Sequence, residues 1–343
     1  MRGIDTPVRQ RRRRVFKEVA NLAYNSKNLK DDMEALPYKI VDYEESEFWE
    51  SVYRDRAIIR GRIRLAMGMS LRPENREHPG HLTQGLEESN IDEKYYEPPL
   101  MQVIPSACNA CPENRYEVTS SCMGCLAHPC MEVCPKGAVS LDRTTGRSII
   151  DQEKCIKCGR CASVCSYNAI IIQERPCAKA CGMDAITSDE NGKANIDYDK
   201  CVSCGQCLVN CPFGAIADKS QIFQTIRAIQ SGEKVYAAVA PAFVGQFGPK
   251  VTPGKLRAAM KELGFADVFE VAIGADLCAK QEAEDFLKEV PDELPFMATS
   301  CCPAWSVMAK KLFPDHANCI SMALTPMTLT ARLIKKHNPN AKV

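Results

Sequence analysis

The sequence predicts a mixed α+β and α/β protein made of three successive parts. Three observations support this fold class: apolar residues recur at helical spacing near the start, cysteines crowd the middle, and short apolar strands alternate with helices towards the end. We therefore expect a mainly helical segment over residues 1–107, a cysteine-rich domain over residues 108–218, and a partial α/β domain with parallel strands over residues 219–343.

The first part contains no cysteine, and nothing in it indicates a function. Phe16, Val19 and Ala23 recur at helical spacing, and a longer helical pattern runs from Glu44 to Met67. Nine of the first thirty residues are lysine or arginine, against two acidic residues. We interpret this excess as a solvated basic arm in preference to a site for an acidic partner.

The last part alternates strands with helices, which indicates a parallel sheet with crossover helices. Gly264 is expected to cap the second of these helices. The expected strands are Val235–Ala240, Val268–Ile273 and Phe296–Thr299, and the expected helices are Ser220–Ile229, Pro253–Leu263, Ala279–Val290 and Pro303–Leu312.

The composition of the whole chain argues against several classes of protein. Its 343 residues carry a net charge of only +1, whereas nucleic-acid binding needs a broad basic face. No apolar run approaches the ~20 residues of a transmembrane helix, and no secretory signal is visible. The sequence therefore predicts a cytoplasmic protein with no membrane span and no nucleic-acid partner.

Cysteine is the outlier of the composition, with twenty residues, of which sixteen lie between Cys108 and Cys211. A disulfide framework suits a short secreted chain, whereas repeated Cys-x2-Cys spacing in an intracellular chain indicates metal ligation. One pattern, Cys-x2-Cys-x2-Cys-x3-Cys, occurs in two full runs, one stretched run and one partial run. These runs are Cys155, Cys158, Cys161 and Cys165; Cys201, Cys204, Cys207 and Cys211; Cys122, Cys125, Cys130 and Cys134; and Cys177 with Cys181.

This spacing is typical of 4Fe-4S clusters in ferredoxin-type domains. Three cysteines of a tight loop ligate one cluster, and the fourth ligates the other cluster of a pair. Zinc also binds single Cys-x2-Cys loops, but two full runs favour iron–sulfur clusters. The sequence thus predicts an electron-transfer protein.

Sixteen cysteines suffice for four clusters with four ligands each. Crossed pairing predicts two ligand sets, Cys122, Cys125, Cys130 and Cys165, and Cys155, Cys158, Cys161 and Cys134. For the remainder we predict the sets Cys201, Cys204, Cys207 and Cys181, and Cys108, Cys111, Cys177 and Cys211. The alternative is three clusters, with Cys108 and Cys111 as bystanders.

Two adjacent cysteines, Cys301 and Cys302, precede the expected helix Pro303–Leu312. The N-terminus of a helix lowers the pKa of a nearby thiol and favours the thiolate. Neighbouring side chains cannot both face one point without strain, so one cysteine can be a ligand while the other faces elsewhere. The pattern predicts a reactive or ligating thiol pair.

Around these thiols, the segment TSCCPAW resembles the first active-site motif of iron-only (FeFe) hydrogenases, and residues 122–343 as a whole are similar to these enzymes. The similarity includes Val239–Ala242 and Gly274–Leu277. Ala304, where the best-studied members have glycine, indicates a divergent subgroup. The resemblance implies reversible reduction of protons to hydrogen in an anaerobic cell, with ferredoxin or a similar soluble electron carrier as partner.

The resemblance also implies roles for single residues. Cys302 would ligate the cubane of the active-site H-cluster, and Cys301 would pass protons to its di-iron unit. A thiol, carboxylates and a hydroxyl at hydrogen-bond spacing make a proton relay, although a solvated helix face also explains the carboxylates. The remaining implied residues are Glu282, Asp285 and Ser321 of the proton path, and Ala240 and Pro241 of the loop that lines the di-iron site. Two further cysteines, Cys278 and Cys319, are expected to be buried small residues.

Two later cysteine motifs of the family do not occur in this sequence. We therefore expect a C-terminally truncated chain that binds no intact H-cluster and makes no hydrogen alone, while the full-length protein would be a ferredoxin hydrogenase. The alternatives are a polyferredoxin-type electron carrier and a hydrogenase-like protein used in sensing or cluster assembly.

Overall fold

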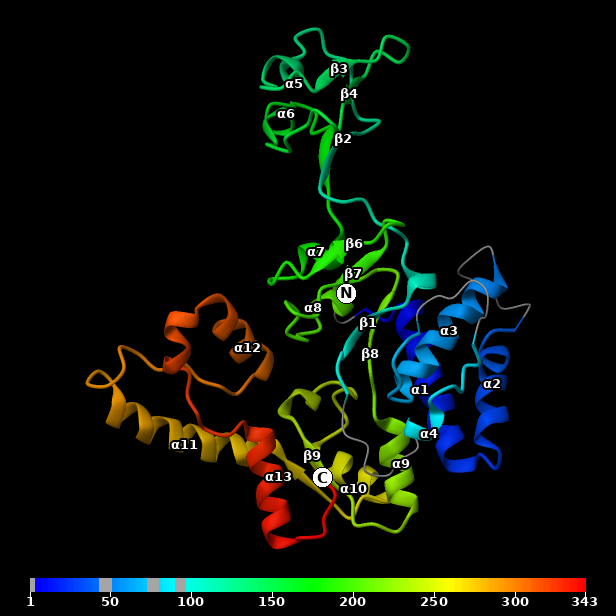
Figure 1. Cartoon of the computed structure of the whole chain (residues 1–343), viewed down its shortest axis with the longest axis vertical. Coiled ribbons are helices and arrows are strands. Elements are labelled where there is room, and N and C mark those ends of the chain that lie inside the picture. Colours follow the sequence, from blue (N-terminus) through cyan, green and yellow to red (C-terminus); the bar gives the residue numbers. More distant parts are fainter. Residues whose placement is uncertain (1–3, 43–50, 73–79, 90–96) are drawn as a thin grey trace. The chain divides into compact units, whose positions relative to one another are not determined.

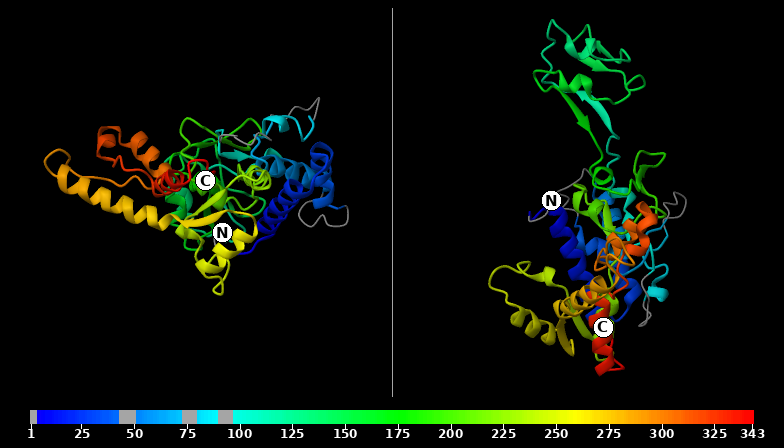
Figure 2. Two further views of the ribbon diagram at one scale, coloured as in Figure 1. Left: turned by 90° about the horizontal axis from the view of Figure 1, so that it is seen from below. Right: turned by 90° about the vertical axis from the view of Figure 1, so that its left-hand side faces the viewer.

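The computed structural model describes residues 4–42, 51–72, 80–89 and 97–343 (Figures 1 and 2). The chain separates into two packing units. The first consists mainly of residues 105–200 and 206–216, and the second of residues 5–104, 201–205 and 217–343. Mixed helices and short strands make up both units, in agreement with the predicted mixed fold class.

Three long helices open the second unit: α1 (Pro7–Asn25), α2 (Leu29–Ile40) and α3 (Val52–Ala66). Helix α1 begins at Pro7 because the side chain of Thr6 accepts a hydrogen bond from the backbone N–H of Arg9. The apolar faces of these helices meet in one core that buries Val19, Ile59 and Ile63 completely. The predicted helix start at Glu44 lies outside the described residues. A short helix, α4 (Leu86–Ser89), follows them.

Helix α9 (Ile222–Gln230) belongs to the same core. Its Phe223 is 1% exposed and belongs to the same core cluster as apolar residues of α1 and α3, and α9 packs against α1. The side-chain amide of Gln224 donates hydrogen bonds to the carbonyl oxygens of Met67 and Ser89, both at 2.9 Å. The structure therefore groups α9 with the N-terminal helices, whereas the predicted boundaries at 107 and 219 placed them in different parts. The spacing of apolar residues predicts a helix but does not show which other helix its apolar face packs against.

The arginine run of α1 corrects one interpretation. Arg11 forms an ion pair with the fully buried Asp55 at 3.3 Å, and Arg12 forms one with Asp218 at 2.9 Å. Arg11 and Arg12 therefore attach α1 to α3 and to the segment before α9, whereas Arg13 and Arg14 of the same run are exposed, as in a solvated basic arm. Within the described residues, no helix combines the length and apolar character that crossing a membrane requires.

The first unit consists of very short elements between the cysteines. Its helices are α5 (Pro129–Glu132), α6 (Arg160–Ser163), α7 (Pro176–Lys179) and α8 (Gln206–Asn210). Its antiparallel strand pairs are β2 (Arg115–Val118) with β5 (Ile170–Gln173), β3 (Val139–Leu141) with β4 (Ser148–Ile150), and β6 (Ile186–Ser188) with β7 (Ala194–Ile196). Two further strands, β1 (Met101–Val103) and β8 (Ile216–Asp218), pair with each other, and β1 and most of β8 belong to the second unit. The elements repeat as a short helix followed by a strand, which matches the repetition of the cysteine runs.

The remainder of the second unit contains β9 (Tyr236–Val239) and β10 (Asp267–Glu270), which pair in parallel over four residues. Helix α10 (Pro253–Glu262) connects them, and Gly264 follows it with a φ of 106°, as expected for a helix cap. The later helices are α11 (Val271–Glu289), α12 (Pro303–Leu312) and α13 (Pro326–His337). Single parallel bridges join Val235 to Lys342 and Ala298 to Ile320.

Two predicted elements differ from the structure. The strand expected over Val268–Ile273 ends at Glu270, and α11 starts at Val271, because apolar residues at this point suit a buried helix as well as a strand. The strand expected over Phe296–Thr299 is reduced to the bridge at Ala298. Helix α13 packs against α11 (Figures 1 and 2), and a Cβ at Gly274 of α11 would lie 2.5 Å from the carbonyl oxygen of Pro326.

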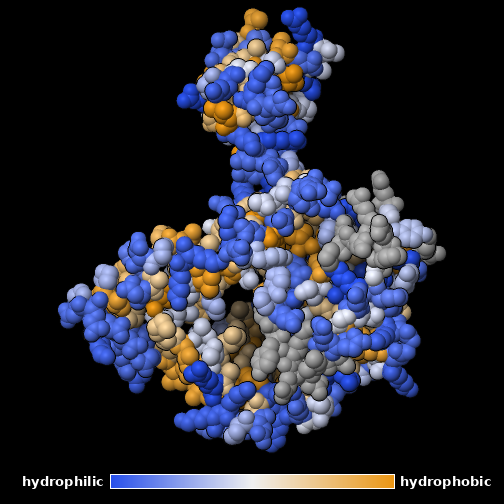
Figure 3. All heavy atoms as spheres, viewed as in Figure 1, coloured by the Kyte–Doolittle hydropathy of each residue, from blue (hydrophilic) through white to orange (hydrophobic). Residues whose placement is uncertain are grey.

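Helices α11 and α12 and the loops beside them expose large apolar side chains, part of which form the orange areas of Figure 3. Leu287 is 80% exposed and Phe313 is 60% exposed. The apolar surface of these helices is therefore only partly covered by the described residues, in contrast to the core around α1, α3 and α9.

Asp267 at the start of β10 supports a prediction on pH dependence. Its carboxylate accepts hydrogen bonds from Nε and Nη2 of Arg257 at 3.0 and 2.8 Å and pairs with Lys261, so that Arg257 first of all holds the pKa of Asp267 well below its ordinary value. A depressed folded-state pKa stabilises the fold above the ordinary pKa of about 3.9 and loses this effect as pH falls towards the folded value. Asp267→Asn is therefore expected to lower the unfolding temperature at neutral pH, and by less at pH values below about 3.9. The exposed Asp292→Asn serves as the control in the same thermal unfolding series, and equal shifts at every pH would contradict the prediction.

Candidate iron–sulfur and thiol sites

The Cys-x2-Cys loops share one backbone conformation. In the first Cys-x2-Cys of each full or stretched run, and in Cys108-x2-Cys111, the residue before the second cysteine has a positive φ: 58° at Gly124, 58° at Lys157, 56° at Ser203 and 45° at Ala110. Positive φ is uncommon for residues other than glycine and persists where the surrounding structure requires it. The loop of Cys108 and Cys111 therefore folds in the same way as the loops of the recognised runs.

The last cysteine of every run also has a common environment. Its sulfur accepts a hydrogen bond from the backbone N–H of a buried alanine four residues later, with N···S distances from 3.2 to 3.4 Å. The alanines are Ala138, Ala169, Ala185 and Ala215, bonded to Cys134, Cys165, Cys181 and Cys211. Such N–H groups stabilise negative charge on sulfur. The partial run that ends at Cys181 therefore closes like the other three.

One group of predicted ligands gathers around a small apolar core of the first unit. Cys130 and Cys161 are buried there with Val139 and Ile170, and Cys134 and Cys165 pack against them. Burial raises the pKa of the Cys161 thiol, and the neighbouring Cys155 and Cys134 raise it further. Of the three remaining cysteines of these two sets, Cys122 and Cys125 are half-buried and Cys158 is exposed. The structure thus brings together members of both predicted sets of this pair.

Cys122, the first cysteine of the stretched run, has a different environment. Burial opposes ionisation of its thiol, but hydrogen bonds from the backbone N–H groups of Gly124 and Ser148 lower its pKa below the ordinary value. A thiol that ionises readily is a better ligand for iron.

The second group contains Cys108, Cys111, Cys177 and Cys211. Burial raises the pKa of Cys177 to about 11, and the nearby Cys211 and Cys108 add to this effect. Burial likewise raises the pKa of Cys111, with Cys108 and Cys211 as further contributors. The sulfur of Cys108 accepts a hydrogen bond from the backbone N–H of Ala194 at 3.3 Å. The fold therefore brings four thiols that are far apart in the sequence into electrostatic reach of one another, although no three of these side chains, as they stand in the described residues, are close enough to hold a metal ion.

Sequence reasoning missed one residue of this group, Arg175. Its guanidinium lies beside the thiols of Cys111 and Cys177 and lowers the pKa of both, against the larger effect of burial. It is 4% exposed. Its place next to Pro176-Cys177 was the only available signal, and one arginine beside a cysteine does not indicate burial.

The remaining predicted set divides between the units, because Cys201 and Cys204 belong to the second unit whereas Cys181 and Cys207 belong to the first. The sulfur of Cys201 accepts a hydrogen bond from the backbone N–H of Ser203 at 3.4 Å, and Cys204 is exposed. The pairing of this set stays a prediction.

Cys301 and Cys302 are both exposed at the turn before α12. The preceding segment connects them to two other predicted residues. The backbone N–H of Ser300 donates to Oε1 of Glu282 at 3.4 Å, and the backbone N–H of Ser321 donates to the carbonyl oxygen of Ala298 at 2.8 Å. The structure thus brings Glu282 and the buried Ser321 to the segment that leads into the thiol pair.

The other residues of the predicted relay have contacts or surroundings of their own. Asp285 accepts a hydrogen bond from Gln281 at 2.9 Å on its own helix, α11. Ala240 and Pro241 are exposed in a loop after β9, beside a cavity of about 550 Å³ whose lining includes Val239, Phe243 and Ile273. The predicted proton path is therefore only partly assembled.

Cys278 and Cys319 are buried, as predicted. The thiol of Cys278 donates to the carbonyl oxygen of Leu324 at 2.9 Å. Burial and the charge of Glu282 raise its pKa. Both cysteines are therefore interpreted as buried small residues and not as ligands.

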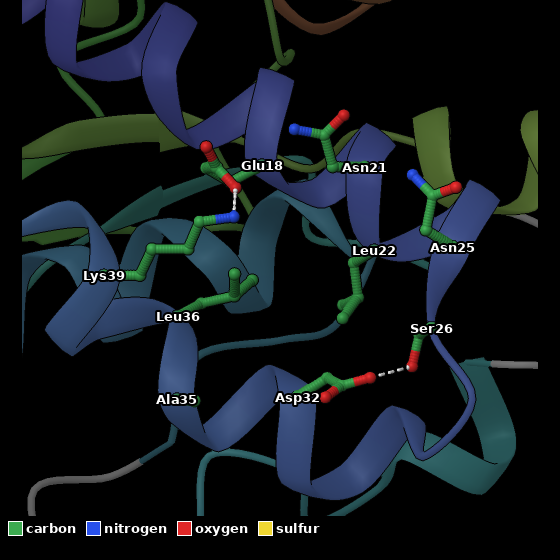
Figure 4. A pocket seen from close by; sticks show the side chains of 9 residues that line it. All are labelled: Glu18, Asn21, Leu22, Asn25, Ser26, Asp32, Ala35, Leu36 and Lys39. Atoms are coloured by element: carbon green, nitrogen blue, oxygen red, sulfur yellow. Dashed lines mark hydrogen bonds and ion pairs between the residues drawn. The ribbon is translucent and has the colours of Figure 1, made fainter.

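A separate pocket of about 490 Å³ lies between α1 and α2 (Figure 4). Its polar side chains bind one another: Lys39 pairs with Glu18 at 2.6 Å, and Ser26 donates to Asp32 at 2.6 Å. No cysteine lines it. We assign no function to this pocket.

The thiol groups suit 4Fe-4S clusters on three grounds. The donors are cysteine sulfurs, all twenty cysteines are free of disulfide bonds, and backbone N–H groups point at the sulfurs of every run. In addition, Nη1 of Arg175 is buried beside one thiol group without a hydrogen-bond partner among the described residues. A bound anionic group would satisfy this donor.

Family models match three segments of the chain. Residues 233–343 match the iron-only hydrogenase large subunit, C-terminal domain. Residues 148–171 match a 4Fe-4S binding domain, and residues 172–222 match the LdpA Fe-S cluster-binding domain.

The chain is 33% identical over 210 residues to iron hydrogenase 1 of Clostridium pasteurianum. The aligned segment covers 58% of this chain and 36% of that protein. The chain is 33% identical over 128 residues to the NADP-reducing hydrogenase subunit HndD of Solidesulfovibrio fructosivorans, covering 35% of this chain and 20% of that protein. It is also 42% identical over 48 residues to the polyferredoxin-like subunit of an aliphatic sulfonate oxidoreductase from Pyrococcus furiosus, covering 14% and 28% of the two chains. The matched segments thus span about a third or less of the length of these relatives.

Proposed function

Because this chain is an iron-only hydrogenase-like protein with ferredoxin-type 4Fe-4S domains, we propose that it transfers electrons for the interconversion of protons and hydrogen. The observation that carries the proposal is the succession, in one chain, of the repeated cysteine runs and the thiol pair before α12. The first feature serves electron transfer, and the second lies in the domain that resembles the hydrogenase large subunit.

We propose four clusters, held by the four ligand sets that crossed pairing predicts. When bound, 4Fe-4S clusters supply one-electron chemistry. The Cys-x2-Cys loops that carry their ligands each contain a residue with left-handed backbone conformation, and backbone N–H groups of the chain point at the sulfurs. The conformation of Ala110 and the proximity of the half-buried Cys108 and Cys111 to the buried Cys177 and Cys211 support the fourth cluster over the three-cluster alternative.

At the second site, we propose Cys302 as a ligand of the active-site cluster and Cys301 as the group that holds a proton at its Sγ. Glu282 would exchange this proton at Oε1, which already accepts the N–H of Ser300. Asp285 and Ser321 would continue the path, and Ala240 with Pro241 would line the site. The exposure of both thiols and the contacts of the segment 298–300 support this assignment.

For the electron partner, we propose ferredoxin or a similar soluble carrier in a reducing cytoplasm, which the free thiols and the ferredoxin-like relatives support. Three apolar side chains around the first cysteine runs are exposed: Leu126 (94%), Met123 (67%) and Ile156 (56%). Exposed apolar residues beside a redox group suit a transient protein contact.

This docking site leads to a prediction. Leu126→Glu is expected to slow reduction of the protein by reduced ferredoxin roughly tenfold, the effect of losing about 1.4 kcal/mol at the contact. Stopped-flow absorbance of the clusters measures the rate. Leu287→Glu, which changes an 80% exposed leucine of the other unit, is the control. Equal rates in the two variants would contradict the site.

The function itself is tested with anaerobically prepared protein after maturation by the assembly proteins of the family. Reduced ferredoxin should reduce its clusters, as seen by electron paramagnetic resonance. Because residues 1–343 are expected to make no hydrogen alone, the second site is tested in a longer protein that also carries the two later cysteine motifs of the family. There, Cys301→Ala should abolish hydrogen evolution while leaving cluster reduction unchanged. Hydrogen evolution at the wild-type rate after Cys301→Ala would refute the assignment of the second site.

A polyferredoxin-type electron carrier is the second candidate. It is favoured by the packing of residues 105–200 and 206–216 as their own unit and by the polyferredoxin-like relative. A protein that accepts electrons from ferredoxin, passes them to another acceptor and never forms hydrogen would support this candidate.

A further inference from the structure

Arg175 is a buried charged residue that the predicted ligand sets do not use. It lies two residues before Cys177 and is 4% exposed. A buried charge is unfavourable unless it is paired and hydrogen-bonded. Its position in the first unit therefore requires partners.

One end of the guanidinium has three partners. Its Nη2 donates to the carbonyl oxygen of Cys111 at 2.9 Å, to Oγ of Ser188 at 2.6 Å and to the carbonyl oxygen of Gly192 at 2.7 Å. Ser188 ends β6, and Gly192 lies in the turn before β7. Arg175 thus ties the loop of Cys111 to the hairpin that follows Cys177. All three acceptors are neutral, so they leave the positive charge uncompensated.

The other end has no such partner. Nη1 is buried without a hydrogen-bond acceptor among the described residues. Native proteins rarely leave a buried donor unsatisfied unless a bound group completes its bonding. Geometry places the guanidinium at both ligand segments: Nη2 bonds the backbone of Cys111, and Arg175 is the residue that directly precedes α7, the helix that contains the buried Cys177.

We propose that Arg175 is a positioning residue of the cluster held by Cys108, Cys111, Cys177 and Cys211, with Nη2 holding the split ligand run together and Nη1 donating a hydrogen bond to the sulfur of that cluster. The proposal rests on the proposed four-cluster function. A positive charge and a hydrogen bond to sulfur both favour the more negative, reduced form of a cluster. Arg175 therefore raises the reduction potential of this cluster.

The test uses the whole chain, purified anaerobically as wild type and as Arg175→Gln, Arg175→Lys and Arg143→Gln. Arg143 is an exposed arginine of the same unit and controls for the loss of one charge. Iron analysis counts the clusters, and redox titration followed by electron paramagnetic resonance gives their midpoint potentials.

In Arg175→Gln, we expect the midpoint potential of one cluster to become more negative by at least about 59 mV. For a one-electron couple, this shift corresponds to a tenfold change in the equilibrium constant of reduction. Arg175→Lys keeps the charge and should shift the same potential by less. Arg143→Gln should shift none, because water screens an exposed charge. Loss of about four irons from Arg175→Gln alone, with the Lys variant intact, would equally support the proposal.

Two outcomes would overturn the role of Arg175: unchanged potentials in both Arg175 variants, or loss of about four irons from both, which would leave the residue a structural tie only. A wild-type protein with about twelve irons would instead refute the four-cluster function, independently of Arg175.

Discussion

Replacing Cys111 with serine is expected to lower the iron content of the anaerobically purified protein from about sixteen to about twelve atoms per chain. Cys111 lies among the thiols of the second ligand group, since Cys108 and Cys211 both raise its pKa. Serine preserves the size of the side chain but is a poor ligand for iron–sulfur clusters, which are held by thiolates. The cluster with three remaining cysteines should therefore be lost or become labile.

Cys319→Ser is the matched control. Cys319 is 1% exposed and belongs to no predicted ligand set, so its replacement should keep about sixteen irons. Iron and acid-labile sulfide analysis measures both variants. An identical iron content in Cys111→Ser and in wild type would show that Cys108 and Cys111 are bystanders and would restore the three-cluster alternative.

Phe223→Ala is expected to destabilise the second unit by about 3–5 kcal/mol, the cost of removing a buried aromatic side chain and leaving a cavity. Phe223 is 1% exposed, and it joins α9 to the core of the N-terminal helices. Its removal therefore weakens the attachment of residues 1–107 to the segment before the hydrogenase-like domain. Urea unfolding followed by helical circular dichroism measures the free energy of unfolding.

Arg227→Ala tests the same helix at an exposed position and should change the free energy of unfolding by no more than about 0.5 kcal/mol. Equal effects of the two substitutions would mean that α9 is not part of the common core. A smaller loss than about 1 kcal/mol in Phe223→Ala would lead to the same conclusion.

The cysteine runs show how far a sequence determines a site. The repeated spacing indicated iron–sulfur ligation because ligand spacing is a local property of a short loop. The boundaries of α10 and α12 were also predictable, since Pro253 and Pro303 begin these helices and Gly264 follows the first with a positive φ.

Other features needed neighbours that the sequence does not identify. The apolar residues after Glu270 suit a strand or a helix equally, and packing against α13 at Gly274 accompanies the helix. The arginines of α1 have the composition of a solvated arm, but Asp55 and Asp218 pair with two of them. In both cases long-range contacts override a local preference.

By itself, then, the sequence determined the chemistry: thiolate ligands at 4Fe-4S spacing and a thiol pair at the start of a hydrogenase-like helix. The sequence left open whether Cys108 and Cys111 join Cys177 and Cys211 or are bystanders, and the tertiary structure makes them neighbours. Only the tertiary structure buried Arg175 beside them. The physical reason is the range of the interactions. Loop geometry is set by neighbouring residues, whereas burial and the charge around a thiol depend on residues that folding alone brings together.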